Sequence, residues 1–107
     1  MTQAAESSLR GKRALVTGGG QRVGQAIALS LGAQGMHVAV HYRESREGAE
    51  HTAELIREAG GSAVLVQADL AEREQARSLV DRALQLLGGL NLLVPSVVPL
   101  GSGNVDI

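Results

Sequence analysis

Short, mostly apolar runs alternate with segments of helical periodicity along this chain of 107 residues. Runs of this kind are typical of parallel strands, which are covered on both faces. Glycine turns and polar loops separate the runs from the helical segments. The pattern predicts four strands, at about residues 12–17, 37–42, 62–67 and 90–94.

A helix is predicted between each pair of successive strands. The first runs from near Arg22 to Gly35, and the second covers about residues 46–59, where Gly60 and Gly61 end it. Each carries apolar residues three or four positions apart, which should face the sheet. The inward residues of the first helix are Val23, Ile27 and Leu31. Those of the second helix are Ala49, Ala53 and Ile56.

The third helix has the clearest periodicity in the sequence. Its apolar residues recur at intervals of one, three or four positions, and Gly88-Gly89 ends it. Asp69 is predicted to cap its first turn, and Glu72 is placed to reach back and complete a capping box. The inward residues are Ala76, Leu79, Val80, Ala83, Leu84 and Leu87.

Strands that alternate with helices predict an α/β fold with a parallel sheet. Right-handed crossovers place the first two helices on one face of the sheet and the third on the other. The expected strand order is therefore 3-2-1-4, the first half of a doubly wound, Rossmann-like sheet. Residues 1–107 are expected to form one domain, with 1–11 a flexible arm and 95–107 an irregular tail.

A glycine turn joins the first strand to the first helix. Gly18, Gly20 and Gly24 let the backbone approach a ligand closely, and the amides of the first helical turn point toward an oxyanion there. The match to G-x-G-x-x-G is imperfect, because Val23 stands at the third glycine position and Gly24 follows it. The alternative is that this turn only reverses the chain direction and binds no ligand. Its place at the start of an alternating sheet favours the pyrophosphate of a dinucleotide.

The residues around this turn resemble those of a known enzyme family. The turn follows the pattern T-G-x-x-x-R-(L/V)-G, and a His-Tyr pair closes the second strand, with a serine soon after. The matching residues are Thr17, Gly18, Arg22, Val23, Gly24, His41, Tyr42 and Ser45. Over about residues 12–94 the chain resembles the short-chain dehydrogenase/reductase family, in particular its pteridine reductase-like branch. The resemblance implies, in the parent enzyme, hydride transfer from NADPH to a carbonyl or a pterin C=N bond.

The charges after the second strand bear on the choice of cofactor. An NAD site places a carboxylate there, whereas an NADP site needs a cation. The strand ends without an acid, and Arg43 and Ser45 follow, which favours the 2′-phosphate of NADP(H). Glu44 opposes this assignment, and the alternative is that these residues form a solvated loop. Arg22 is placed to pair with the pyrophosphate or with the 2′-phosphate.

The resemblance adds contacts at the adenosine end of the cofactor. It implies that Asp69 contacts the adenine amino group and that Leu70 packs against the ring. His41 is expected to act at the same end rather than as a metal ligand, and no metal site is predicted. The predicted cofactor-binding residues are Gly18, Gly20, Gln21, Arg22, Val23, Gly24, His41, Tyr42, Arg43, Ser45, Asp69, Leu70 and Ser96.

The catalytic residues of the family have no counterpart in this sequence. The family uses a Tyr and a Lys four residues apart on a later helix, whereas the only tyrosine here is Tyr42 and the only lysine is Lys12. Pro95-Ser96-Val97 stands where an Asn-Asn-Ala motif is expected. The chain as given should therefore be inactive. It is expected to be the N-terminal portion of such a reductase or, alternatively, a stand-alone, non-catalytic nucleotide-binding or interaction module.

Composition and charge narrow the range of partners. A net charge of −1 and a single aromatic residue provide neither a basic patch nor a stacking platform for nucleic acid, and no cationic face for a membrane. The sequence has no cysteine, no signal-peptide pattern and no run of membrane-spanning length, so a cytoplasmic protein is expected. Residues 90–94 would form an uncharged sheet edge, and a single helix would cover one whole face. Self-association through that edge or that face is expected.

Overall fold

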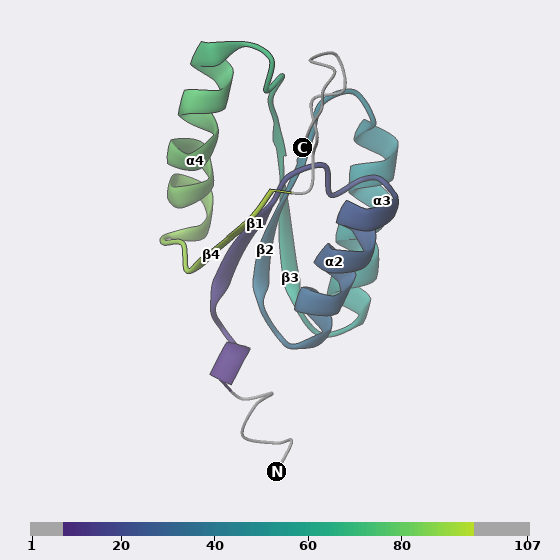
Figure 1. Cartoon of the computed structure of the whole chain (residues 1–107). Helices are drawn as coiled ribbons and strands as arrows, with labels where there is room; N and C mark the ends of the chain where they lie inside the picture. Colours follow the sequence, from purple (N-terminus) through teal and green to yellow (C-terminus); the bar gives the residue numbers. More distant parts are fainter. Residues whose placement is uncertain (1–7, 96–107) are drawn as a thin grey trace.

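A computed structural model describes residues 8–95 of the chain. It contains a 4-stranded parallel sheet in the order β3-β2-β1-β4, as the sequence predicts (Figure 1). The strands are β1 (Arg13–Val16), β2 (His37–Tyr42), β3 (Ser62–Gln67) and β4 (Leu92–Val94). The helices between them are α2 (Arg22–Ala33), α3 (Arg46–Glu58) and α4 (Arg73–Leu87).

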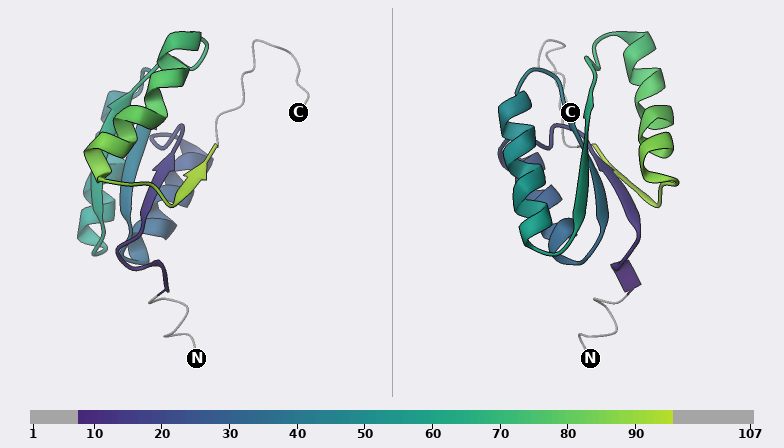
Figure 2. Two further views of the ribbon diagram at one scale, coloured as in Figure 1. Left: turned by 90° about the vertical axis from the view of Figure 1, so that its left-hand side faces the viewer. Right: turned by 180° about the vertical axis from the view of Figure 1, so that it is seen from behind.

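Helices cover both faces of the sheet (Figure 2). α2 and α3 lie on one face and α4 lies on the other, which confirms the arrangement expected from right-handed crossovers. One apolar cluster, which includes Val38, Val40 and Ile56, fills the α2–α3 side. A second cluster, which includes Leu15 and Leu79, fills the α4 side. Neighbouring residues of a strand point to opposite faces of the sheet. Because helices cover both faces, the strands are apolar along their whole length.

The strands agree with the sequence except at β4. β2 and β3 have the predicted bounds, whereas β4 begins at Leu92 instead of residue 90. Asn91 provides the reason, because its side-chain Oδ1 accepts the N–H of Arg13 at 2.9 Å. The N–H of Asn91 in turn donates to the carbonyl oxygen of Arg13 at 2.8 Å. An amide side chain therefore takes the first position of the ladder, and regular pairing starts with Ala14 and Leu92.

α2 buries small residues more deeply than the larger side chains of the predicted apolar stripe. Val23 is 65% exposed, and the predicted residues Ile27 and Leu31 are only partly buried. The residues that α2 buries are Gly24, Ala28 and Gly32. The close approach of α3 selects these small residues, because a Cβ on Gly32 would lie 2.6 Å from Cγ2 of Ile56. The prediction that Val23 faces inward is therefore wrong. Ile27 and Leu31 pack against the edge of the core beside the contact between α2 and α3.

The start of α4 also differs from the prediction. Asp69 does not cap the helix, since the N-cap residue is Glu72, which forms no side-chain cap. Asp69 Oδ1 instead accepts the N–H of Ala71 at 3.0 Å, and the carbonyl of Asp69 accepts the N–H of Glu72 at 2.9 Å. A short carboxylate bonded to the backbone two residues later closes a turn of its own, so the helix begins beyond that turn. The predicted capping box is wrong.

The first described residues are attached to the α2–α3 side. Leu9 packs against the apolar cluster of that side, and the N–H of Gly11 donates to the carbonyl of Gly35 at 3.0 Å. The predicted arm is therefore tied to the fold before residue 11. Residues 1–7, and the part of the predicted tail from Ser96 onward, lie outside the described residues. Within residues 8–95, no helix is long and apolar enough to cross a membrane.

Candidate functional site

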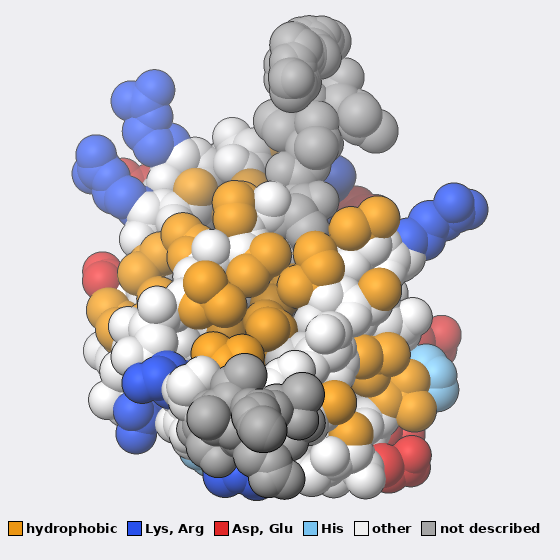
Figure 3. Space-filling view, turned by 60° about the horizontal axis from the view of Figure 1, so that its bottom comes forward, with side chains coloured by type: hydrophobic (Ala, Val, Ile, Leu, Met, Phe, Trp, Pro, Cys, Tyr) orange, Lys and Arg blue, Asp and Glu red, His pale blue; other side chains and the backbone are white. Residues whose placement is uncertain are grey.

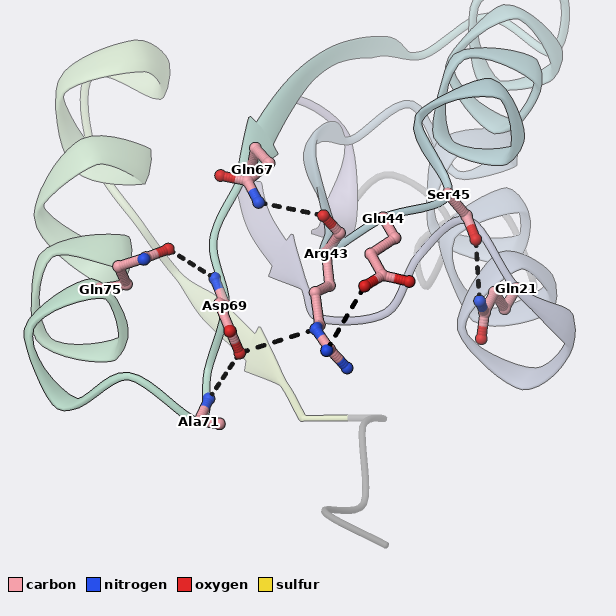
Figure 4. Close-up of polar contacts among 8 residues, drawn as sticks. All are labelled: Gln21, Arg43, Glu44, Ser45, Gln67, Asp69, Ala71 and Gln75. Carbon is pink, nitrogen blue, oxygen red and sulfur yellow. Dashed lines mark hydrogen bonds and ion pairs between the residues drawn. The ribbon is translucent and has the colours of Figure 1, made fainter. Parts of the chain in front are cut away.

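Loops at the carboxyl ends of three neighbouring strands bring most of the predicted residues together. The turn 17–20 follows β1, residues 43–45 follow β2 and Asp69 follows β3 (Figure 4). In the order β3-β2-β1-β4 the winding of the sheet reverses between β1 and β4. The turn therefore leaves β1 at the switch point, which is where open α/β sheets bind their ligands.

The glycine turn lies close against the sheet and α3. Gly18 has a φ of 64°, a left-handed conformation that favours glycine. A Cβ on Gly19 would lie 2.7 Å from Cγ1 of Val40, and a Cβ on Gly20 would lie 2.7 Å from the backbone nitrogen of Ala49. The sequence pattern identified Gly18 and Gly20 and missed Gly19, although the run of three glycines was a signal for it. A side chain would therefore be strained at Gly18, would press on Val40 at Gly19 and would meet the backbone of α3 at Gly20.

α2 begins directly after this turn, at Arg22. The N-cap residue Gln21 forms no side-chain cap, and the first turn of α2 contains no acidic residue. The amides of that turn therefore carry a partial positive charge that no side chain of the turn neutralises. A helix end of this kind accommodates the oxyanions of a phosphate group. The exposed Arg22 adds a full positive charge beside it.

Side chains of α2 and α3 hold the turn in place. Gln21 Nε2 donates to Ser45 Oγ at 3.0 Å, which links the start of α2 to the loop after β2 (Figure 4). The buried Thr52 of α3 accepts from Gln25 Nε2 at 2.9 Å, and its one hydroxyl proton faces the carbonyl oxygens of Gly48 at 2.9 Å and Gly19 at 3.0 Å. Thr52 was not among the residues predicted for the site. Its only signal was a hydroxyl on the otherwise apolar inner face of α3.

Arg43 lies at the end of β2 between two carboxylates (Figure 4). Its Nη2 is 3.4 Å from Glu44 Oε2, and its Nε is 3.7 Å from Asp69 Oδ1. The Arg43 side chain is 62% exposed. Gln67 Nε2 donates to the carbonyl of Arg43 at 3.0 Å, and Gln75 Oε1 accepts the N–H of Asp69 at 2.7 Å. Neutral amide side chains thus fix both loops, and a guanidinium lies between them.

Several predicted residues have other surroundings than expected. Tyr42 is buried on the α2–α3 side, where its hydroxyl accepts from Arg46 Nη1 at 2.9 Å. The hydrogen bond from Arg46 to Glu50, together with the contact with Tyr42, raises the pKa of the arginine. Leu70 is half-buried against the α4-side cluster. Ser96 lies outside the described residues. The Tyr42 side chain therefore belongs to the core rather than to the surface of the site.

His41 lies beneath the turn instead of on its surface. The residue is 1% exposed. Its Nδ1 accepts the N–H of Gly18 at 2.9 Å, and its Nε2 lies 2.9 Å from the carbonyl oxygen of Ala68. Burial lowers the pKa of His41, the hydrogen bond to Ala68 opposes that effect, and the positive charge of Arg82 lowers the pKa further. His41 therefore contacts the backbone on both sides of the site.

The curated relatives of this chain are mostly much longer than it is. An uncharacterized oxidoreductase of Methylorubrum extorquens is 47% identical over 88 residues, which cover 82% of this chain and 36% of that protein. The chain spans 33% of two further relatives. The short-chain dehydrogenase/reductase homolog YusS of Bacillus subtilis differs in this respect. It is 39% identical over 83 residues, which cover 78% of this chain and 76% of that protein.

Solved structures share both the fold and much of the sequence. A short chain dehydrogenase from Burkholderia cenocepacia J2315, described in complex with NADP, has 45% identity and a TM-score of 0.75, covering 79% of this chain and 35% of its own. An NADH-dependent reductase complexed with NAD has 28% identity and a TM-score of 0.78, covering 84% and 37%. Residues 12–103 match the family described as short chain dehydrogenase. On this match, together with the strand order and the turn after β1, the chain belongs to the short chain dehydrogenase family.

Proposed function

We propose that the chain binds NADP(H), as the nucleotide-binding part of an oxidoreductase of the short-chain dehydrogenase/reductase type. The observation that carries the proposal is the acid-free N-terminus of α2, which follows the glycine turn at the switch point of the sheet. The Burkholderia relative described in complex with NADP supports this cofactor. Another relative is described with NAD, so the choice between the two cofactors rests on Arg43.

In this proposal each phosphate group has its own partners. The pyrophosphate lies against the turn and the first amides of α2, where Arg22 adds charge. Arg43 turns from Glu44 and Asp69 to the 2′-phosphate, beside the hydroxyl of Ser45. Exposed ion pairs contribute only about 0–1 kcal/mol, so their exchange for a phosphate contact costs little. A guanidinium also matches the geometry of a phosphate better than that of two separate carboxylates.

The loop after β3 forms the adenine end of the proposed site. The bond from Ala71 uses one acceptor site of the Asp69 carboxylate, and a carboxylate has several, so the adenine amino group can donate to it as well. Leu70, half-buried beside it, offers an apolar surface for the ring. His41 and Tyr42 act from below, as part of the support of the site rather than as its surface.

Calorimetric titration tests the cofactor assignment. NADP⁺ and 2′,5′-ADP should bind more tightly than NAD⁺ and 5′-ADP. The change Arg43→Ala should reduce the difference by about 1.5–3 kcal/mol, the contribution of a hydrogen bond to a charged group. The control Arg77→Ala, at an exposed position of α4, should leave the difference unchanged. Equal affinity for both pairs contradicts the choice of NADP(H), and no binding of any of the four contradicts a nucleotide site.

We also propose that this chain alone does not reduce a substrate. Its only tyrosine, Tyr42, is buried, and its hydroxyl oxygen accepts a hydrogen bond from Arg46. Its only lysine, Lys12, precedes β1, whereas Tyr42 ends β2, and the two parallel strands place them at opposite ends of the sheet. They cannot form a proton-donor pair. Purified chain mixed with NADPH and a panel of ketones and pterins should show no NADPH oxidation above that of a no-protein control, and turnover would contradict the proposal.

For a longer protein that contained this chain, we place the activity in the pteridine reductase-like branch. Arg22 in the turn, together with the His41-Tyr42 pair at the end of β2, supports this choice. Such a protein would transfer hydride from NADPH to a carbonyl or a pterin C=N bond with residues that this sequence does not contain. Steady-state assays of the longer protein with both substrate classes test the assignment.

A second candidate function is a stand-alone nucleotide-binding or interaction module. The homolog YusS favours it, since the chain covers 76% of that relative. Sequencing of the same reading frame downstream of Ile107 separates the two candidates. A serine followed by Tyr-x-x-x-Lys would indicate the reductase, whereas an immediate stop codon would indicate the module.

We further propose that the chain pairs with a second copy of itself through β4. β4 is the edge of the sheet on the β1 side and carries no charged residue. Figure 3 shows hydrophobic side chains gathered across the lower front of the molecule, the side on which β4 lies in Figure 1. The large hydrophobic residues exposed on β4 and α4 are Leu84, Leu86, Leu92 and Leu93. An antiparallel, two-fold pairing of two β4 strands would give hydrogen-bond partners to the N–H and C=O groups of the sheet edge and would cover part of this hydrophobic surface.

A further inference from the structure

His41 connects three segments that are far apart in the sequence. Its ring accepts from Gly18 of the turn after β1 and contacts the carbonyl of Ala68 after β3. Its own carbonyl, at the end of β2, accepts the N–H of Gly19 at 2.9 Å. A single residue thus holds two consecutive amides of the glycine turn. The same ring anchors that turn to the loop that carries Asp69.

The partners of the ring determine its protonation state. A backbone amide can only donate, so Nδ1, which faces the N–H of Gly18, carries no proton. A carbonyl can only accept, so Nε2, which faces Ala68, carries one. Only the neutral tautomer with its proton on Nε2 satisfies both bonds. A second proton would place an N–H against the N–H of Gly18 at 2.9 Å and would bury a charge.

We propose that neutral His41 is a positioning residue for the glycine turn, and that its protonation releases the turn and weakens nucleotide binding at acid pH. The inference rests on the proposed nucleotide site and adds the residue that controls the shape of that site. Loss of the acceptor removes the hydrogen bond that holds the N–H of Gly18 against the ring. The turn then no longer has one fixed geometry for the pyrophosphate.

The charges around His41 favour the neutral ring. The alternation along β2 places His41 on the same face as Ala39, which belongs to the α4-side cluster. From α4, the positive charge of Arg82 acts on the ring. From the loop after β3 the nearby acid in sequence is Asp69, whose carboxylate is engaged with Ala71 and Arg43. The turn 17–20 contributes no ionisable side chain. Release is therefore expected below the ordinary pKa of 6.5.

NADP⁺ titrations between about pH 8 and pH 5 test the inference with two matched variants. In His41→Asn the side-chain oxygen lies near the position of Nδ1 and can accept from Gly18, but it does not titrate. Between pH 8 and pH 5 the affinity of this variant should fall less than that of the natural chain, by a factor of about three or more. In His41→Gln the amide lies near the position of Nε2, so binding should be weak throughout. The titration of the cofactor's own phosphate is common to all three proteins and cancels.

Nitrogen NMR of the natural chain without nucleotide provides a readout that needs no binding. At neutral pH, Nδ1 should be unprotonated and Nε2 protonated, and the amide signal of Gly18 should change as the ring titrates. Circular dichroism at each pH shows whether the fold persists. Identical binding profiles for the natural chain and His41→Asn, or a Gly18 signal that does not follow the ring, would overturn the inference. If NADP⁺ does not bind at pH 8, the proposed function fails, and the Gly18 signal alone decides whether His41 holds the turn.

Discussion

The core of the sheet and its β4 edge are closed to very different degrees. On the α2–α3 side Val38, Val40 and Ile56 are completely buried, at 0% exposure, whereas Leu92 and Leu93 of β4 are 37% and 48% exposed. Two helices cover one face, and α4 alone covers the other (Figure 2). The glycine turn packs against this core at Val40 and Ala49, and Gln21 at the start of α2 is bonded to Ser45 of the loop after β2. The parts that would hold a nucleotide are therefore well packed, although β4 lacks cover among the described residues.

Truncation of one side chain in the core and of one at the β4 edge tests this comparison, and the loss of stability in the core should be the largest effect predicted here. Ile56→Ala removes a completely buried side chain and should lower the free energy of unfolding by about 2–5 kcal/mol. Leu93→Ala removes a side chain that is already 48% exposed and should lower it by about 1 kcal/mol or less. Urea denaturation measures both losses. Equal losses of stability would mean that the β4 edge is as tightly packed as the core between the sheet and α3.

The glycine turn should be intolerant of a side chain where it meets α3. Gly20→Ala places a methyl group 2.7 Å from the nitrogen of Ala49, which should cost about 1–3 kcal/mol of stability and weaken NADP⁺ binding. Gly60→Ala is the control. Its φ of +104° strains the new residue, but a Cβ there meets nothing within 4 Å and the position is remote from the turn. Calorimetry on folded protein should show weaker binding for the first variant only, and unchanged binding by both would contradict the close fit.

A charge on β4 should separate the two copies of the proposed dimer. Leu93→Lys puts a positive charge on an edge that otherwise has none, and self-association should weaken by about tenfold, or 1.4 kcal/mol. Gln85→Lys adds the same charge at an exposed position of α4 and should change little. Light scattering over a concentration series measures the association. If the natural chain remains a monomer at high concentration, the edge does not pair.

Acid should reduce the stability of the chain through His41, and we expect this effect to be the smallest. The folded chain has a His41 pKa below the ordinary 6.5, mainly because the ring is buried. Below about pH 6.5 the unfolded chain therefore takes up the proton first, so the free energy of unfolding falls as the pH falls. Above that pH the contribution is fully present. Urea midpoints from pH 8 to 5 should show a smaller fall for His41→Asn than for the exposed control His51→Asn; equal falls would remove His41 as the cause.

The sequence predicted the sheet well because the relevant signals were local. β2 and β3 are apolar runs with turns on both sides, and crossover handedness then determines the strand order. Hydrophobic periodicity marks the buried face of α2 poorly, because Gly24 and Gly32 contribute little hydrophobicity. Their burial follows from the approach of Ile56 on another helix, and this approach exists only in the folded chain.

The residues of the site also form two groups, those that a local motif locates and those that only the fold brings together. Gly18, Gly20 and Asp69 could be located from motif spacing. The bond from Gly18 to His41 joins residues 23 positions apart, and the bond from Thr52 to Gly19 joins residues 33 positions apart. No periodicity encodes such pairs. For this reason the sequence predicts His41 only as a cofactor-binding residue at the adenosine end, whereas the fold places its ring beneath the glycine turn.

The pairing of β1 with β4 has a consequence for the order of folding. It closes a loop of 78 positions between Arg13 and Asn91, whereas the contact of β2 with β3 joins His37 and Ser62, 25 positions apart. The additional loop entropy amounts to about 1 kcal/mol, and the short β4 offers few buried side chains to offset it. β4 should therefore join the sheet last during folding and open first in the native state. Its amide hydrogens should exchange with solvent well before those of β2.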